Sequence, residues 1–406
     1  MKIFTAVLPN GIRLLHVQER GEVAYCGAMV NAGTRDELPD EHGLAHLAEH
    51  MLFKGTAKRS STDIIDRLEG VGGDLNAFTT KEDTTLYAVS LKKHLWRAYE
   101  LVADLVFHSL YADDELNKER MVVMDEIDSY LDDPSDLIMD DFEDLIFSGY
   151  ALGRNILGTK QALRGYRSRH LRAFVDRCYT PDQVVIFSMG AVSFDRIYAM
   201  ATACFESVPA RQRAYERQQP LTYLKNTCEM RKRTSQMHCQ LGGRAYAKSH
   251  PDRTALHLAN YLLGGPNASS RLNMCLREQR GLVYMVESSY VAYTDTGLWS
   301  VYFGADKHDQ DQILDLIRQE VCRLQHEPLS QLKLRRLKDQ FLSQLVIAAE
   351  NRESWLLSAV RQYMVSGKIE SQREIGQRVR QVEAEQLCAV AREVMDPDRL
   401  SCLIYR

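Results

Sequence analysis

The sequence divides into two halves of almost equal length at a polar segment bracketed by two prolines. This segment, residues 209–220, contains several arginines and shows no apolar periodicity. Seven residues that begin at His46 resemble seven that begin at His257, 211 positions further along the chain. Because the repeat and the break divide the chain at the same place, we expect two related halves.

Each half contains runs of strand-like sequence followed by long amphipathic segments. The residue pattern predicts strands at 87–91 and 298–303 and helices at 96–109 and 310–325. Long helices that follow runs of strands favour an α+β fold with antiparallel or mixed sheets over a βαβ winding. We therefore predict two related α+β domains, each a sheet flanked by helices. The domains are expected at residues 1–208 and 222–406, with a solvated linker at 209–221.

Composition restricts the class of protein. The 406 residues are 45% hydrophobic and 26% charged, with a net charge of −4, which excludes disordered, collagen-like and disulfide-scaffold chains and argues against a nucleic-acid partner. The nine cysteines form no CxxC pair, as is typical of a reducing compartment. The sequence has no apolar run long enough for a membrane span, and its first residues lead into a predicted hairpin rather than a secretion signal. We expect a cytoplasmic protein without a membrane or nucleic-acid partner.

One predicted helix, over residues 43–54, carries two histidines one turn apart. On a helical wheel its large apolar residues share one side, whereas His46, Glu49 and His50 gather on the other. Imidazoles at positions i and i+4 can hold one Zn²⁺ between them, and a neighbouring carboxylate suits a base that activates water. This HxxEH pattern is the inverse of the HExxH zinc-protease helix. A solvent-facing polar stripe is the alternative interpretation of the same spacing.

A catalytic zinc ion needs a third protein ligand. Residues 113–131 predict a helix on which Glu119 and Glu126, two turns apart, stack at one edge of an apolar stripe. Taken alone, each glutamate is an ordinary surface residue. Beside an HxxEH helix, both become candidates to contact a metal or its ligands, because a carboxylate at the border of a core face needs a partner.

Two other histidines are not expected to bind the metal. His42 lies one turn before the motif and is interpreted as a helix cap or a surface residue. His257 begins the second copy of the repeat, where Asn260 and Tyr261 replace the glutamate and histidine of the first copy. It is interpreted as a hydrogen-bonded or exposed histidine.

Further stretches along the chain extend the pattern beyond the HxxEH helix. They are His46–His50, Phe53–Thr56, Gly72–Thr79, Glu119–Arg120 and Glu126–Ile127 in the first half, and Ser269–Leu272, Leu276–Glu278 and Gly281–Tyr284 in the second. Together they resemble the pitrilysin family of zinc metallopeptidases, in particular the mitochondrial processing peptidase β subunit and its short bacterial relatives. The resemblance covers nearly the whole chain and implies half of a pitrilysin-type clamshell.

The resemblance also implies roles for individual residues around the metal. His46, His50 and Glu126 would hold one Zn²⁺ per chain, and Glu49 would be the general base. Glu119 would be a carboxylate outside the ligand set that stabilises the positions of the ligands.

Residues away from the metal also have implied roles. Arg277 and Tyr284 correspond to the family's Arg/Tyr pair, which comes from the opposing half of the clamshell. In a chain of this length the opposing half would be a second subunit, so the pair would act in trans in a homodimer. Asn76 and Ala77 lie on the strand expected to pair with an extended substrate. Without the resemblance, Arg277 and Tyr284 are an exposed helical arginine and a sheet tyrosine.

The function implied is a zinc endopeptidase that hydrolyses unfolded peptides in a closed dimeric chamber. One alternative is a non-catalytic peptide-binding or assembly subunit, which the intact set of candidate ligands disfavours. A second alternative is a catalytic subunit that needs a different partner chain. The presence of the zinc motif and the Arg/Tyr pair in one chain favours a self-sufficient homodimer.

Overall fold

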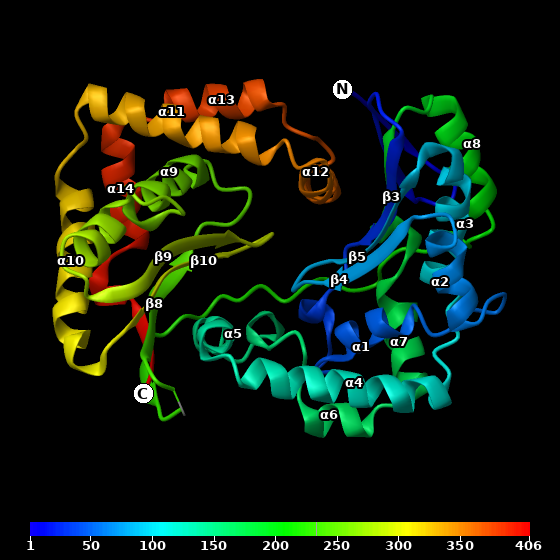
Figure 1. Ribbon diagram of the computed structural model, residues 1–406, viewed down its shortest axis with the longest axis horizontal. Coiled ribbons are helices and arrows are strands. Elements are labelled where there is room, and N and C mark those ends of the chain that lie inside the picture. The colour runs from blue at the N-terminus through cyan, green and yellow to red at the C-terminus, as the bar shows by residue number, and fades with distance from the viewer. Residues whose placement is uncertain (233) are drawn as a thin grey trace. The chain divides into compact units, whose positions relative to one another are not determined.

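Two separate β-sheets form in the chain, one from each half of the sequence (Figure 1). The computed structural model describes residues 1–232 and 234–406. Each sheet belongs to one of two units. Unit 1 holds most of the predicted domain 1–208, and unit 2 holds most of the predicted domain 222–406. Unit 1 comprises Met1–Ser129, Arg154–Gln218 and Arg352–Ile369, and unit 2 comprises Tyr130–Gly153, Gln219–Asn351 and Glu370–Arg406.

The sheet of unit 1 has six strands in the order β1-β2-β6-β3-β5-β4. They are β1 (Lys2–Val7), β2 (Arg13–Gln18), β3 (Val23–Val30), β4 (Asp74–Thr79), β5 (Thr84–Leu91) and β6 (Val184–Gly190). β2 and β6 run parallel, and the other neighbours are antiparallel. The hairpin predicted for the first residues is present as β1 and β2, and Gly11 in its turn adopts a φ of +94° that favours glycine.

The sheet of unit 2 repeats this topology. Its order is β7-β11-β8-β10-β9, in which β7 and β11 are parallel and the other neighbours antiparallel. When the strands of each sheet are numbered in chain order, this order and these directions are the same as those of β2-β6-β3-β5-β4 in unit 1. The internal repeat that the sequence suggested is therefore present in the topology. The strands are β7 (Thr227–Met230), β8 (Met237–Ala245), β9 (Val283–Ala292), β10 (Gly297–Ala305) and β11 (Ser401–Tyr405).

Helices cover both faces of the first sheet (Figure 1). They are α1 (Leu44–Met51), α2 (Ser61–Glu69), α3 (Leu95–His108), α4 (Asp113–Leu131), α6 (Lys160–Gly165), α7 (Ser168–Cys178), α8 (Phe194–Phe205) and α12 (Arg352–Ser366). Along β6, Val184 and Ile186 join the core under α3 and α8, whereas Val185 and Phe187 join a second core under α12. Successive strand residues point to opposite faces, so a strand covered on both faces is buried along its whole length, as β6 is.

The second sheet is covered in the same way. Its helices are α5 (Pro134–Ile146), α9 (Arg253–Gly264), α10 (Gln310–His326), α11 (Gln331–Ala348), α13 (Gln372–Gln381) and α14 (Ala384–Val394). Trp299 and Val301 of β10 face the core that contains α9, α10 and α14, and Leu298 and Tyr302 face α5. Among the described residues, no helix combines the length and the apolar character required to span a membrane.

Each unit contains one helix from the other half of the sequence. α5 follows α4 in the first half, yet its Leu137 and Phe142 pack on the sheet of unit 2. α12 lies in the second half, yet its Leu356 and Val360 pack on the sheet of unit 1. Burial of the second apolar face of each sheet is the physical reason for this exchange.

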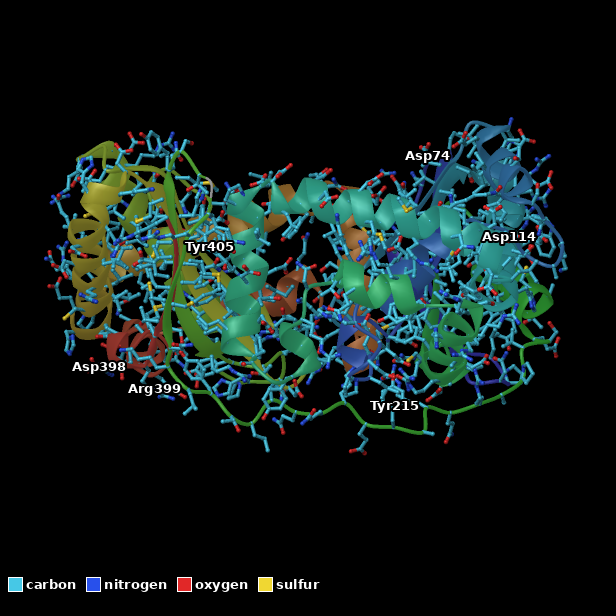
Figure 2. All side chains as sticks on the ribbon, turned by 90° about the horizontal axis from the view of Figure 1, so that it is seen from below. Asp74, Asp114, Tyr215, Asp398, Arg399 and Tyr405 are labelled. Carbon is cyan, nitrogen blue, oxygen red and sulfur yellow. The ribbon has the colours of Figure 1, made fainter. Side chains whose placement is uncertain are left out.

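The polar segment at 209–218 is not the solvated linker that we predicted. The side chains of Arg213 and Arg217 are only 9% and 10% exposed, and Nη2 of Arg217 lies 2.7 Å from Oδ2 of the fully buried Asp36. Tyr215, labelled in Figure 2, donates a hydrogen bond to Oδ1 of Asp36 at 2.9 Å. These three side chains alternate with exposed residues, so one edge of an extended segment packs against unit 1. The prediction was wrong because arginine and tyrosine can be buried when a buried carboxylate pairs with them.

Candidate metal centre

Helix α1 is buried on nearly all sides, so the polar residues of the HxxEH motif face the protein interior. His46 and Glu49 are 8% and 7% exposed, which excludes the solvent-facing stripe. The helix follows Gly43, whose φ is +84°. A Cβ atom at this position would lie 2.6 Å from Cα of Gly158, so the start of α1 requires glycine.

A buried carboxylate holds the first turn of α1. Oε1 of Glu37 accepts a hydrogen bond from the amide of Ala45 at 2.9 Å, and Oε2 accepts one from the amide of Gly43 at 3.1 Å. Such amides at a helix start have no partner within the helix. Burial raises the pKa of Glu37 to about 8. Glu37 was not predicted as a site residue, because it lies outside the helix and no periodicity links it to its partners.

His46, His50 and Glu126 bring three potential ligand atoms together. Oε2 of Glu126 lies 3.8 Å from Nε2 of His46 and 3.7 Å from Nε2 of His50, and the three atoms lie within 4.8 Å of one another. Ligands of a tetrahedral zinc ion at about 2.0–2.2 Å are separated by roughly 3.4 Å. The two distances from Glu126 exceed this separation by only a few tenths of an ångström.

The chemistry of these donors fits zinc. Burial and the nearby His50 lower the pKa of His46 to about 3, so its ring is neutral and offers a lone pair at neutral pH. Nδ1 of His46 is buried and has no hydrogen-bond partner in the part of the chain that the structure describes. Two imidazoles and one carboxylate are a ligand set of catalytic zinc sites, which keep a fourth position open.

Glu49 lies on the same helix, between the two histidines in sequence. Its Oε2 accepts a hydrogen bond from Oγ1 of Thr79 at 3.0 Å. Burial raises the pKa of Glu49, although His50 and the hydrogen bond from Thr79 act in the opposite direction. A raised carboxyl pKa suits a group that accepts a proton near neutral pH. Thr79 was not predicted as a partner of Glu49, because it is 30 residues away and meets Glu49 only through the packing of α1 near β4.

Glu119 lies behind His50 and is more deeply buried than Glu126. Its Oε2 is 3.2 Å from Nδ1 of His50, and its Oε1 is 2.7 Å from Nζ of Lys54. The side chain of Glu119 is 8% exposed, compared with 45% for Glu126. Glu119 and Glu126 are two helical turns apart on α4, but they contact the site differently. Glu119 contacts Nδ1 of His50, whereas Glu126 lies near Nε2 of both histidines. Lys54 was also missed, because its only sequence signal is its position one turn after His50.

His42 and His257, which were not expected to bind the metal, lie apart from this cluster. Nε2 of His42 donates a hydrogen bond to the carbonyl of Asn155 at 3.1 Å. His257 lies on α9 with its ring centroid 4.6 Å from that of Tyr290, and burial lowers its pKa to about 4. Neither belongs to a group of three or more potential metal ligands within the described residues.

Comparison with known proteins identifies the family. The family model described as insulinase (peptidase family M16) matches residues 14–160, and the model described as the peptidase M16 inactive domain matches residues 168–341. The uncharacterized zinc protease YmxG of Bacillus subtilis is 31% identical over 396 residues, which cover 97% of this chain and 96% of that protein. The chain belongs to peptidase family M16. An uncharacterized zinc protease of Mycobacterium leprae is 32% identical over 96% of this chain and 88% of its own length.

Solved structures share the fold of this M16 chain at lower sequence identity. A protease from Helicobacter pylori superimposes with a TM-score of 0.90 at 20% identity, over 100% of this chain and 99% of that chain. A structure described as a peptidase M16 inactive domain, from Pseudomonas fluorescens, gives a TM-score of 0.92 at 19% identity, over 100% and 98%. The α+β architecture predicted from the sequence is therefore confirmed.

The implied Arg/Tyr pair of this M16 chain lies at the surface of unit 2. Arg277 is exposed in the π-helical segment η5 (Asn273–Glu278), and Tyr284 follows near the start of β9 with 56% of its surface exposed. Gly281, with a φ of +63°, forms the turn between them. The hydroxyl of Tyr284 donates a hydrogen bond to Oδ1 of Asp306 at 3.4 Å.

The implied substrate-binding residues lie on β4, at one edge of the sheet of unit 1. Asn76 is exposed and Ala77 is half-buried. The same strand ends at Thr79, the hydrogen-bond partner of Glu49. A sheet edge and the candidate base are thus connected through a single short strand.

Proposed function

We propose that this chain is a zinc-dependent endopeptidase that hydrolyses unfolded peptides. The observation that carries the proposal is the meeting of His46, His50 and Glu126 beside the buried Glu49. The M16 family and the relatives named zinc proteases support the same reaction. Within the family, the quoted motifs favour the branch of the mitochondrial processing peptidase β subunit.

The residues of the site have distinct roles in this proposal. His46, His50 and Glu126 would hold one zinc ion, which when bound polarises the scissile carbonyl and makes water a better nucleophile. Glu49 accepts a proton from the attacking water and delivers it to the leaving amine. Thr79 fixes the Glu49 carboxylate through its hydrogen bond.

The edge strand β4 offers a place for the substrate backbone. An extended peptide can add to the edge of a sheet through main-chain hydrogen bonds, with side chains at alternate positions providing selectivity. Asn76 and Ala77 would contact such a peptide. Only an unfolded segment can pair in this way, so folded proteins would be excluded.

The proposal includes a homodimer in which Arg277 and Tyr284 act in trans. Exposed arginine and tyrosine side chains can stabilise negative charge on the substrate during the reaction. Closure of two subunits around a peptide would form the chamber. We place this dimer in the cytoplasm, because all nine cysteines are free thiols.

The decisive experiment replaces Glu49 by glutamine. The purified chain with Zn²⁺ should cleave an unstructured fluorogenic peptide, and Glu49→Gln should retain zinc while losing about 10²–10⁴-fold in turnover. Glu115→Gln, which changes a carboxylate of α4 that pairs with Lys118 and not with the candidate ligands, is the matched control. Undiminished cleavage by Glu49→Gln would contradict its role. Zinc binding without cleavage by the wild type would favour an assembly subunit or a missing partner chain.

A mixing experiment tests the shared site. Glu49→Gln chains and Arg277→Ala/Tyr284→Ala chains should each be inactive alone. Exchange of subunits should restore activity, because one of the two sites in the heterodimer is then intact. Absence of recovery in demonstrated heterodimers would contradict the arrangement in trans.

A further inference from the structure

Two cysteines of unit 2 lie in contact on neighbouring strands. Cys239 of β8 and Cys402 of β11 are diagonal neighbours on one face of the sheet, because the register pairs Cys239 with Ile404 and Cys402 with Leu241. Their sulfur atoms are 3.6 Å apart. A disulfide bond has a sulfur–sulfur distance of about 2.05 Å, so an approach of roughly 1.5 Å would convert the contact into a bond.

The two thiols differ in their access to solvent. Cys402 lines a cavity of about 200 Å³, which is walled by Ile317 and other residues of α10 and by the turn η7 (Pro397–Arg399) before β11. Figure 2 labels Asp398 and Arg399 in this turn. Cys239 has no exposed surface. A small reagent that enters the cavity therefore meets Cys402 first.

The surroundings of the two thiols also shift their pKa values in opposite directions. The hydrogen bond with Cys239, assisted by the positive charge of Arg318, lowers the pKa of Cys402 against the effect of burial. Burial raises the pKa of Cys239. Because the thiolate is the nucleophilic form of cysteine, Cys402 is the more reactive of the pair.

We propose that Cys239 and Cys402 form a thiol–disulfide pair that a small hydroperoxide oxidises, with Cys402 as the attacking sulfur and Cys239 as the resolving thiol. This inference is independent of the proposed peptidase activity. It assigns a modification site to the cavity under α10.

The chemistry balances in two steps. The Cys402 thiolate attacks one oxygen of hydrogen peroxide, the O–O bond breaks, and the products are a sulfenic acid at Cys402 and hydroxide. Cys239 sulfur then attacks Cys402 sulfur, the S–O bond breaks, and the departing hydroxide takes the Cys239 proton to form water. The first hydroxide takes up the proton that Cys402 released on forming its thiolate, so overall two thiols are oxidised to a disulfide and one peroxide is reduced to two waters. Thiols of a reducing compartment reverse the reaction by exchange.

The test uses the full-length wild-type chain and hydrogen peroxide. After exposure, remaining thiols are alkylated under denaturing conditions and peptides are mapped by mass spectrometry without reductant. We expect the peptides of Cys239 and Cys402 to be linked, with the loss of two hydrogen atoms, and dithiothreitol to separate them. The exposed Cys322 is the internal reference for peroxide exposure. Oxidation of Cys322 while Cys239 and Cys402 both remain alkylatable would overturn the proposal.

Single variants separate the two roles. In Cys239→Ala, the sulfenic acid at Cys402 has no resolving partner and should be captured by dimedone. In Cys402→Ser, Cys239 should stay reduced, because its sulfur is buried. Cys388→Ala, which changes a buried cysteine elsewhere in unit 2, should form the disulfide like the wild type. Equal oxidation of Cys239 with and without Cys402 would contradict the assigned order of attack.

Discussion

Oε2 of Glu119 lies 3.2 Å from Nδ1 of His50, on the ring edge opposite to Nε2, which lies 3.7 Å from Glu126. A carboxylate at this place keeps the proton on Nδ1 and leaves the lone pair of Nε2 free for a metal. Lys54 holds the other oxygen of Glu119 at 2.7 Å. The orientation of one candidate ligand is thus set by two residues outside the ligand group.

Replacement of Glu119 by glutamine should weaken zinc binding. The amide keeps the size of the side chain but loses the charge that holds the His50 proton, and loss of such a partner lowers metal affinity about 10–100-fold. Competition with a chromophoric chelator measures the change. Glu115→Gln, on the same helix but paired with Lys118 at the surface, should bind zinc like the wild type. Equal affinities for both variants would exclude the orienting role of Glu119.

Removal of zinc should lower the thermal stability of the chain. A ligand that binds only the folded state stabilises it by about 2.7 kcal/mol when its free concentration is 100 times its Kd. Thermal unfolding followed with chelator, and again after zinc is restored, measures this effect. His46→Ala loses one candidate ligand, so its midpoint should be insensitive to both treatments. A similar shift in that variant would place the metal elsewhere.

Replacement of Arg217 by alanine should destabilise unit 1. The change leaves the buried Asp36 carboxylate without its closest cation, and breaking a buried ion pair costs about 3 kcal/mol. Denaturant unfolding of Arg217→Ala measures the loss. Arg211→Ala, at an exposed position of the same segment, should change stability by less than about 0.5 kcal/mol. A second change, Asp36→Asn, should recover part of the loss, and purely additive effects would contradict the pairing.

His257 should make unit 2 less stable in acid. Burial lowers its pKa from 6.5 to about 4, so between these values the unfolded chain binds more protons than the folded chain. The contribution of His257 to the unfolding free energy is constant above pH 6.5 and falls as the pH decreases toward 4, by on the order of 3 kcal/mol. His257→Gln should flatten this dependence in unfolding experiments across that range. His308→Gln, whose imidazole is 77% exposed, should keep the wild-type slope.

The helices of the site could be predicted because their evidence is local. The spacing of His46 and His50 identified α1, and the stripe beside Glu119 identified α4. Glu37 and Thr79 could not be found in this way, because each meets α1 from a separate element and neither has a helical spacing to it. Their contacts with Ala45 and Glu49 depend on how the sheet and helix pack.

The same reason explains the error over the polar segment. Arg213, Tyr215 and Arg217 alternate with exposed residues, which is the period of an extended chain with one buried edge. The alternation was present in the sequence, but a search for alternating hydrophobic residues does not detect it, because the buried residues of this segment are polar. Only the position of Asp36 in the folded unit shows why these arginines are removed from water.

The exchange of α5 and α12 determines how this chain can be divided for experiments. A recombinant fragment that ends near residue 208 would carry α5 without the sheet it covers, and its own sheet would lack α12. The complementary fragment would have the reverse defect. Each fragment would thus expose apolar surface on two elements, so the halves are suited to co-expression and fragment complementation rather than to separate purification.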